Sequence, residues 1–210
     1  MIGTTAHGAM AEGMEGSGWY RYALEGTMTT TTYTLQQFLA DTRATIKSKG
    51  IPSGLEEIRR HLERLLHNPT LLTEHLDDPL SYPPRQTIGH DPETDVHVLV
   101  HGRDKSGKSA PHDHGPCWVV YGNYTNYTQM RRWKRLDDGT TEGHAELALQ
   151  KKFRLNAGQA AAFAVGDIHS IEYPEETFFI RVTGGDVEQQ KTLRFDLEKQ
   201  TVDIEDRTQR

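Results

Sequence analysis

The chain has 210 residues, with 24 basic and 30 acidic side chains, a formal net charge of −6, eleven histidines and one cysteine. This acidic balance excludes an electrostatic nucleic-acid binder, because phosphate neutralisation requires concentrated Lys and Arg, and one cysteine excludes an internal disulfide framework. No apolar run reaches the ~18 residues of a membrane span and no charged-then-apolar leader opens the chain, so we expect a cytoplasmic protein with neither nucleic-acid nor membrane partners.

The first segment, residues 1–33, is rich in Gly, Thr, Ala and Met and shows no sustained hydrophobic periodicity. A segment of this composition buries too little apolar surface to order itself, so we predict a flexible arm. The alternative is an arm that packs through its aromatic side chains Trp19, Tyr20 and Tyr22.

Residues 34–81 show helical periodicity. Thr34 and Gln37 have the spacing of a capping box, and Ser53 and Glu56 repeat that spacing before a second apolar stripe. We predict a helical layer that packs on the rest of the chain and carries no chemistry of its own. The predicted helices run from Leu35 to before Gly50, from Leu55 to before Asn68, and over Leu71–Leu76.

Residues 82–197 have the pattern of short β-strands separated by Gly, Asp or Pro, which is typical of a sandwich or barrel. We therefore predict a mainly β barrel here, followed by a loose polar tail over 198–210. The predicted strands are Val96–His101, Cys117–Tyr121, Tyr124–Trp133, Leu147–Leu155, Ala160–Val165, Ile168–Tyr173, Thr177–Val182 and Leu193–Leu197.

One motif in this region imitates a nucleotide site. Residues 102–109 match the phosphate-loop pattern G-x-x-x-x-G-K-[ST] letter for letter. That motif binds phosphates only where a helix begins at its Lys-Ser pair. Pro111 follows directly and opposes a helix, so we predict a hairpin loop without nucleotide binding.

Two histidine motifs suggest a metal site. On a strand, His112 and His114 project to one side while Asp113 points away, and two imidazoles so placed suit a divalent transition metal. The third candidate ligand, His169, follows a tight turn at Gly166-Asp167 and begins a new strand facing inward.

These motifs together resemble the cupin superfamily. The second family motif, G-x5-P-x-G-x2-H, matches from Gly158 to His169, with Ala164 in place of proline. The first departs twice: four residues instead of five separate Gly107 from the H-x-H pair, and the customary glutamate is missing from Trp118 or Val119. The resemblance implies a mainly β fold, a double-stranded β-helix (jelly-roll barrel) with an N-terminal α-helical layer. It also implies a metal held by His112, His114 and His169.

The missing glutamate bears on the chemistry. Three neutral imidazoles leave the charge of a divalent ion uncompensated and leave positions open for an anionic chelating substrate and O2. The run P-H-D-H-G followed by Trp, behind a helical layer, resembles the cysteine dioxygenase group of thiol dioxygenases. That resemblance implies Fe(2+) and oxidation of a small thiol to a sulfinate.

The family resemblance also implies roles for individual residues. Arg85 stands at about the distance expected for the family's carboxylate-binding arginine; the alternative is a solvated arginine after a proline turn. Arg181 binds an anion if it faces the cavity. If Phe178, Ile180 and Val182 face the cavity instead, Arg181 is solvated. Cys117 lies near the family's crosslinked cysteine, but Thr183 replaces the tyrosine partner, so we expect no crosslink.

Three functions remain open at this stage. The first is an iron oxygenase of the cysteine dioxygenase type, with a small anionic substrate and O2 as partners. The second is another three-histidine cupin that acts on a diketone or acid with Fe, Ni, Mn or Zn, since zinc with a bound water also accepts three histidines. The third is a non-catalytic metal-binding cupin module. Barrel edge strands are compatible with a homodimer.

Overall fold

Helical patterning in the first part of the chain produces three α-helices in the computed structural model, which describes residues 32–206 and 208. The arm predicted over 1–33 therefore lies outside the described residues except at its last two positions. The capping box of the first helix is confirmed, because the Gln37 backbone N–H donates to Thr34 Oγ1 over 3.2 Å and Thr34 N donates to Gln37 Oε1 over 2.9 Å. The helices are α1 (Leu35–Lys49), α2 (Leu55–Leu66) and α3 (Leu71–His75), and a 3-10 turn covers Pro79–Ser81.

Eleven strands follow within the described residues, and their order defines the fold. The five-stranded sheet has the order β1-β2-β9-β4-β7 and the four-stranded sheet the order β3-β8-β5-β6, with β10 and β11 as a separate pair. The strands are β1 (Gln86–Asp91), β2 (Val96–Arg103), β3 (Gly107–Lys108), β4 (Val119–Asn123), β5 (Tyr127–Arg135), β6 (Leu147–Asn156), β7 (Ala160–Phe163), β8 (Ile168–Tyr173), β9 (Thr177–Gly184), β10 (Lys191–Asp196) and β11 (Thr201–Asp206). Two facing antiparallel sheets in this order form a jelly roll, so the predicted double-stranded β-helix with an N-terminal helical layer is confirmed.

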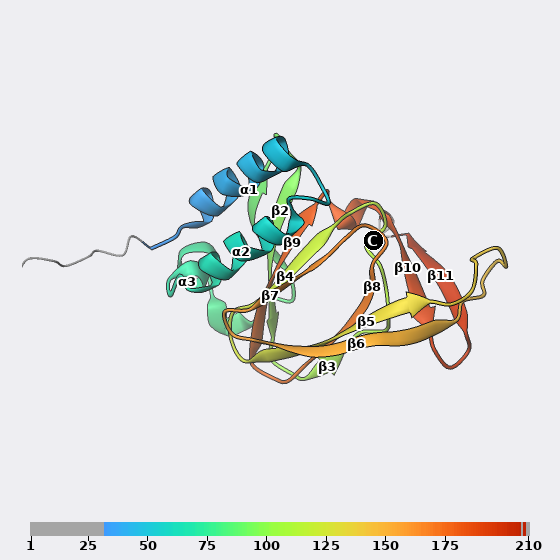
Figure 1. Cartoon of the computed structure of the whole chain (residues 1–210). Helices are drawn as coiled ribbons and strands as arrows, with labels where there is room; N and C mark the ends of the chain where they lie inside the picture. The colour runs from blue at the N-terminus through green and yellow to red at the C-terminus, as the bar shows by residue number, and fades with distance from the viewer. Residues whose placement is uncertain (1–31, 207, 209–210) are drawn as a thin grey trace, which may run out of the picture. The chain divides into compact units, whose positions relative to one another are not determined.

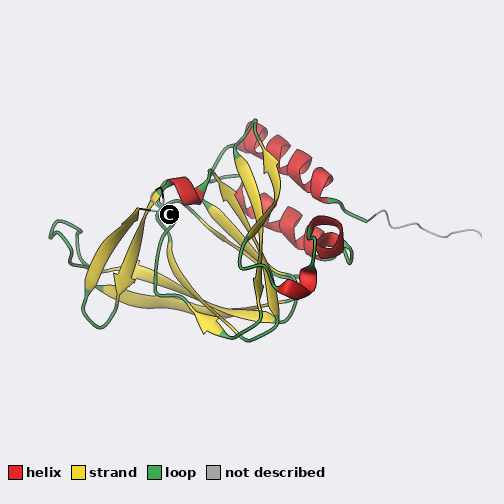
Figure 2. Cartoon of the chain, turned by 180° about the vertical axis from the view of Figure 1, so that it is seen from behind, coloured by secondary structure: helices red, strands yellow, loops and turns green. Residues whose placement is uncertain are grey.

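The five-stranded sheet separates two hydrophobic cores. Its outer face is covered by α1 and α2, as Figure 1 and the reverse view in Figure 2 show. On that side Phe38 and Leu62 pack in the same core as Ile180 and Val182 of β9. Phe179, the residue before Ile180, packs in the barrel interior instead. Successive side chains of a strand alternate between its faces, so β9 presents Phe179, Arg181 and Thr183 to the interior.

Several elements differ from those predicted from the sequence. Residues 201–206 of the predicted loose tail form β11, which pairs along its whole length with β10 and packs Val202 beside Phe195. Residues 86–91 form the unpredicted strand β1. The predicted strand Tyr124–Trp133 begins only at Tyr127, because a turn with Asn126 at φ 58° precedes it. The second helix is capped by Gly54 without a side-chain hydrogen bond, so the capping box at Ser53 does not form.

The segment that imitates a phosphate loop is a crossover. It joins β2 to β3, which belong to different sheets, so it is not the predicted hairpin. Gly107 and Lys108 form β3 and pair with β8, and no helix begins at Lys108 as phosphate binding requires. None of the described helices is long and apolar enough to cross a membrane.

Candidate metal centre

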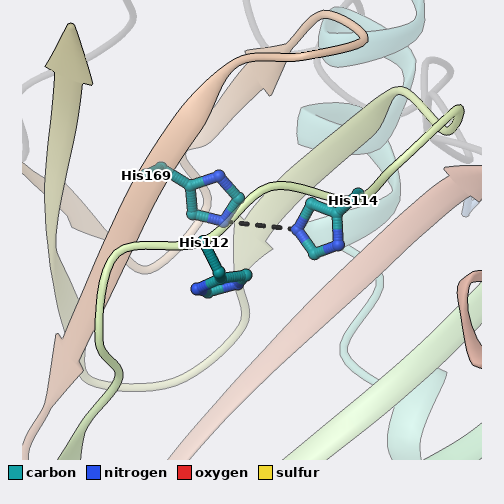
Figure 3. A group of neighbouring side chains, drawn as sticks. All are labelled: His112, His114 and His169. Atoms are coloured by element: carbon teal, nitrogen blue, oxygen red, sulfur yellow. Dashed lines mark hydrogen bonds between the residues drawn. The ribbon is translucent and has the colours of Figure 1, made fainter. Parts of the chain in front are cut away.

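The three predicted ligands come together inside the barrel. Each of His112, His114 and His169 offers a ring nitrogen, and these nitrogens lie within 4.8 Å of one another. Figure 3 shows the rings of His112 and His114, from one loop, directed toward His169 on β8. The Nε2 atoms of His114 and His169 are 3.4 Å apart, and both residues are buried.

A braced turn positions His169. Gly166 adopts φ 81°, a backbone conformation that glycine enters without a steric penalty. The carboxylate of Asp167 accepts hydrogen bonds from Ala164 N over 2.8 Å and from the Arg132 guanidinium over 2.5 Å. The turn and the inward histidine that the sequence predicts at the start of β8 are both present.

The loop that carries the other two ligands is not the predicted regular strand. Its backbone bonds to β8 at separate points: Ser109 N donates to the Ile171 carbonyl over 2.8 Å, and His112 exchanges two hydrogen bonds of 2.9 and 3.0 Å with His169. The Asp113 carboxylate accepts bonds from Gly115 N over 3.1 Å and from Leu193 N on β10 over 2.7 Å. Gly115 has φ 58°, and a Cβ there would lie 2.3 Å from a backbone oxygen of β10, so only glycine fits this turn.

The donor set fits a transition metal. His112 Nδ1 lies 2.9 Å from the Ala110 carbonyl, which only accepts hydrogen bonds, so Nδ1 carries the proton and Nε2 is available to the metal. Burial, and then the charges of His112, Arg132 and Arg181, hold the pKa of His169 well below its usual range, which keeps the ring neutral. Two nitrogens about 2.1 Å from one ion lie roughly 3.0 to 3.4 Å apart, as the nitrogens of His114 and His169 do.

Aromatic side chains enclose the cluster, and the most polar of them, Tyr121, was not predicted from the sequence. The hydroxyl of Tyr121 lies 3.3 Å from His114 Nε2, and the Phe163 ring centroid lies 4.3 Å from that of His169. Tyr121 shares a strand face with Val119, one of the two positions of the missing glutamate. Tyr121 lies two residues after Val119 on β4, so the same family position would have led to Tyr121.

A cleft lined by basic groups opens near the metal centre; we call it the basic cleft. It has a volume of about 490 Å³ and is lined by Pro84, Arg85, His101, Arg103 and Arg181. The structure thus brings together Arg85 and Arg181, the two arginines singled out from the sequence. Arg181 is buried at 5% exposure and Arg85 is 47% exposed in its side chain.

Both arginines meet a carboxylate that sequence reasoning missed. Arg181 Nη2 donates to Oε1 of Glu188 over 3.0 Å, and Arg85 pairs with Oε2 of the same residue. Glu188 lies on a 3-10 turn, Val187–Gln189, that follows β9. Only the tertiary fold brings this turn to the cleft, and no local pattern in the sequence indicated it.

Side-chain contacts connect the basic cleft to the metal centre. His101 stacks on Phe179 with ring centroids 4.8 Å apart, and the Phe179 centroid lies 6.0 Å from that of Tyr121. Burial, and then the charge of Arg181, hold the pKa of His101 well below its usual range. The charge of Arg181 therefore reaches both His101 in the cleft and His169 in the cluster.

The single cysteine lies against the loop after β9. A Cβ added to Gly185 would be 3.0 Å from Cys117 Sγ. Burial, and then the charges of Asp95 and Asp186, raise the pKa of the thiol to about 11. The hydroxyl of Thr183 donates to the Gly185 carbonyl over 2.8 Å. Neutral pH therefore leaves this thiol protonated and weakly nucleophilic.

Comparison with known proteins shows similarity to solved structures only. No protein-family model matches the chain, and a search of curated proteins finds no match. KdgF from Halomonas sp. is similar at 14% identity, over 49% of this chain and 77% of that chain, with a TM-score of 0.37. A double-stranded β-helix protein from Klebsiella pneumoniae is similar at 18% identity, over 55% and 89%, with a TM-score of 0.37. An RmlC-like cupin from Shewanella frigidimarina is similar at 15% identity, over 49% and 75%, with a TM-score of 0.36.

Proposed function

We propose that this chain is an iron(II)-dependent oxygenase of the cysteine dioxygenase type, which uses O2 to oxidise a small thiol bearing an anionic group. The observation that supports this most is a buried three-histidine cluster connected to a basic cleft through the rings of Tyr121 and Phe179. Iron held by three neutral histidines would keep its positive charge and open positions, and would supply coordination of the thiolate and activation of O2.

Arg181 would bind the anionic group of the substrate. Its Nε is buried and has no hydrogen-bond partner among the described residues. Buried polar groups in proteins are almost always paired, so this N–H marks a place where a ligand atom can accept a hydrogen bond. The planar guanidinium presents two donors side by side, which matches the two oxygens of a carboxylate.

Arg85 and Glu188 would control entry to this position. Arg85 is half-exposed at the cleft and can attract an anion from solvent. Glu188 already places its carboxylate on both arginines, so an incoming carboxylate competes with it for the same donors. The cleft is thus selective for a strongly accepting anionic group.

His101 and Tyr121 would shape the space between the anion and the metal. Because burial and neighbouring arginines favour its neutral form, His101 contributes hydrogen bonding without a further positive charge. The hydroxyl of Tyr121 lies beside a ligand nitrogen, from where it can donate a hydrogen bond to an anionic atom that approaches the cluster. The surrounding phenyl rings of Phe163 and Phe179 keep this space apolar.

The test is thiol-dependent O2 uptake by protein purified anaerobically and loaded with Fe2+. We expect uptake with a thiol that carries a carboxylate, and at least about tenfold weaker uptake with a neutral thiol of equal length, which cannot use a charge-assisted hydrogen bond. His169→Ala should bind no iron at the cluster and show no uptake. His75→Ala, on α3, serves as the matched control and should retain both properties.

Two results would contradict the proposal at different levels. Failure of the wild type to hold iron would overturn the metal centre. Iron binding without thiol-dependent O2 uptake would exclude a thiol as the substrate. The remaining candidate for the same site would then be a substrate that chelates the metal through oxygen.

A further inference from the structure

A second cluster of metal-ligating side chains lies on the β1–β2 hairpin and shares no residue with the buried centre. Oδ1 of Asp95 lies 2.9 Å from Nε2 of His97 and 3.2 Å from Nε2 of His90. The two rings stack with their centroids 4.2 Å apart. We propose that His90, Asp95 and His97 form a surface site for a divalent transition-metal ion of the zinc class.

The donor set selects this class of ion. Two imidazole nitrogens and one carboxylate oxygen suit Zn2+, Cu2+ or Ni2+, whereas Mg2+ and Ca2+ prefer oxygen ligands alone. Ligand atoms that share an ion at about 2.1 Å lie roughly 3.0 to 3.4 Å apart, close to the two distances observed here. The third distance, between the two imidazole nitrogens, is within 4.8 Å, so an ion can replace the protons between these groups once the rings close on it.

The strand register brings the two histidines together. A bulge between Thr87 and Gly89 shifts the pairing of β1 with β2, and His90 becomes the direct cross-strand partner of His97. Directly opposed side chains in an antiparallel pair project from the same face. Asp95 is placed beside them by its φ of 52°, and its carbonyl accepts a bond from Gly185 N over 2.7 Å.

The hairpin is held rigidly, which lowers the entropic cost of binding an ion. The guanidinium of Arg43 on α1 donates to the buried carboxylate of Asp91, with a shortest distance of 2.6 Å. Lys47 of the same helix pairs with Glu93 in the turn, and Thr94 Oγ1 donates to Asp91 over 2.5 Å. The ligands are thus carried on a preformed turn.

The site is accessible and locally negative. Asp95 is 65% exposed and His90 is 42% exposed in their side chains, so an ion can enter from solvent and keep water as a further ligand. The charges of Asp95 and Asp186 both act on the nearby Cys117 thiol, which places a second carboxylate near this end of the hairpin. Two carboxylates raise the local concentration of cations.

Equilibrium dialysis of the full chain against Zn2+ tests the site. The wild type should bind two ions, one in the buried cluster and one at the hairpin. His90→Ala and Asp95→Asn should each lose the second ion, or weaken its binding by at least about tenfold, because even the loss of a ligand's hydrogen-bond partner costs about 10- to 100-fold in metal affinity. His144→Ala is the matched control, because His144 also faces a carboxylate, Glu146 at 3.7 Å, but belongs to no group of three ligands among the described residues.

The variants separate this site from the buried one. His169→Ala should lose one ion and keep the hairpin ion. If His169→Ala binds as much Zn2+ as the wild type while His90→Ala loses an ion, the buried centre fails and the hairpin site stands. If His90→Ala and Asp95→Asn both bind as much as the wild type, the hairpin site is overturned.

A chemical footprint on the wild-type protein tests the same site without any variant. Diethylpyrocarbonate acylates exposed imidazoles, and mass spectrometry locates the modified residues. Added Zn2+ should protect His90 and His97 together, while His144 stays reactive. Equal modification of His90 with and without Zn2+ would overturn the proposal even if every variant failed to fold.

Discussion

Arg181 lies on β9 at a point from which its charge acts on two different histidines. It is the register partner of Tyr121 on β4 and of Leu99 on β2, in the middle of the five-stranded sheet. Its side chain is nearly inaccessible to solvent and forms an ion pair with Glu188 over 3.0 Å. A buried guanidinium is costly unless it is paired, so this position is maintained by its partner carboxylate.

Glu188→Gln should therefore change both recognition and stability. Removing the charge frees two arginines to bind an external carboxylate, and we expect KM for a carboxylated thiol to fall by about tenfold. KM for a neutral thiol should stay constant. The folded state should lose about 1–3 kcal/mol, because the buried guanidinium loses its counter-charge.

Steady-state O2 uptake gives KM for each thiol, and thermal unfolding gives the change in the free energy of unfolding. Glu172→Gln is the matched control, since Glu172 pairs with Arg131 on an exposed face. A KM that rises equally for anionic and neutral thiols would show that Glu188 only orients Arg181.

Asp113 is the residue that shapes the loop between two ligands. Its Oδ1 accepts hydrogen bonds from the backbone N–H groups of Gly115 and of Leu193 on β10. Asp113→Ala should therefore weaken Zn2+ binding at the buried cluster by about 10- to 100-fold. Asp113→Asn keeps an acceptor oxygen and should retain most of the affinity. The measurement is a competition titration with a chromophoric chelator. It uses the His90→Ala variant as the parent, because this variant should bind no Zn2+ at the hairpin. Equal affinities for Asp113→Ala and the parent would contradict this role.

Residues of the site differ in how far the sequence alone could locate them. The three histidine ligands stand in compact local motifs, and such motifs carry their own turn and strand geometry. Arg85 and Arg181 came from resemblance to a family and from strand parity. Glu188 reaches the cleft through the turn after β9, and no local spacing relates it to the residues that it contacts.

Ion pairs hold the β1–β2 hairpin against α1. Asp91 ends β1 with 1% exposure of its side chain and accepts three hydrogen-bond contacts from Arg43 of α1. Burial raises the pKa of Asp91, but the hydrogen bonds from Arg43 and Thr94, the charge of Arg43 and a backbone hydrogen bond together hold it below its usual range. One buried carboxylate thus links α1 to the barrel, in addition to the hydrophobic core that the two share.

Asp91→Asn should destabilise the chain in a pH-dependent manner. A carboxyl whose pKa is lower in the folded state stabilises that state above its unfolded pKa of ~3.9, and the stabilisation is lost as pH falls through the folded pKa. We expect the variant to be about 2 kcal/mol less stable at pH 7 and the difference to narrow below about pH 4. Urea unfolding between pH 3 and 7 measures this, and a constant difference would contradict the assignment.

Elements differ in how visible they are in the sequence. Helix α1 has a capping box and an apolar stripe, so local physics places it within a residue. Strand β11 has the sequence pattern of a polar tail. Its Ile204 is 70% exposed, and the strand is ordered by its pairing with β10, which no local pattern indicates. Strand β1 is short and carries Gly89 beside a bulge, which interrupts the alternation that predicts strands.

At the scale of the whole molecule, the jelly roll brings distant segments into one site. Strand β9 lies between β2 and β4, and β8 lies between β3 and β5. Two late strands therefore each pair with two strands that precede them in the sequence. Short alternating strands predict a sandwich or barrel, but pairing over such sequence separations is not encoded in any local pattern. The strand order explains why the H-x-H loop and His169 meet although 55 residues separate His114 from His169.

The measurement that tests the central claim most directly is the fate of labelled oxygen. Iron-loaded protein is supplied with a carboxylated thiol and 18O2, and the product is analysed by mass spectrometry. Oxidation of a thiol to a sulfinate consumes one O2 per thiol, places both oxygen atoms on sulfur and needs no external reductant. We predict a sulfinate that carries both labelled atoms, and no such product from His169→Ala. A disulfide product without label, or equal turnover by His169→Ala, would contradict the account.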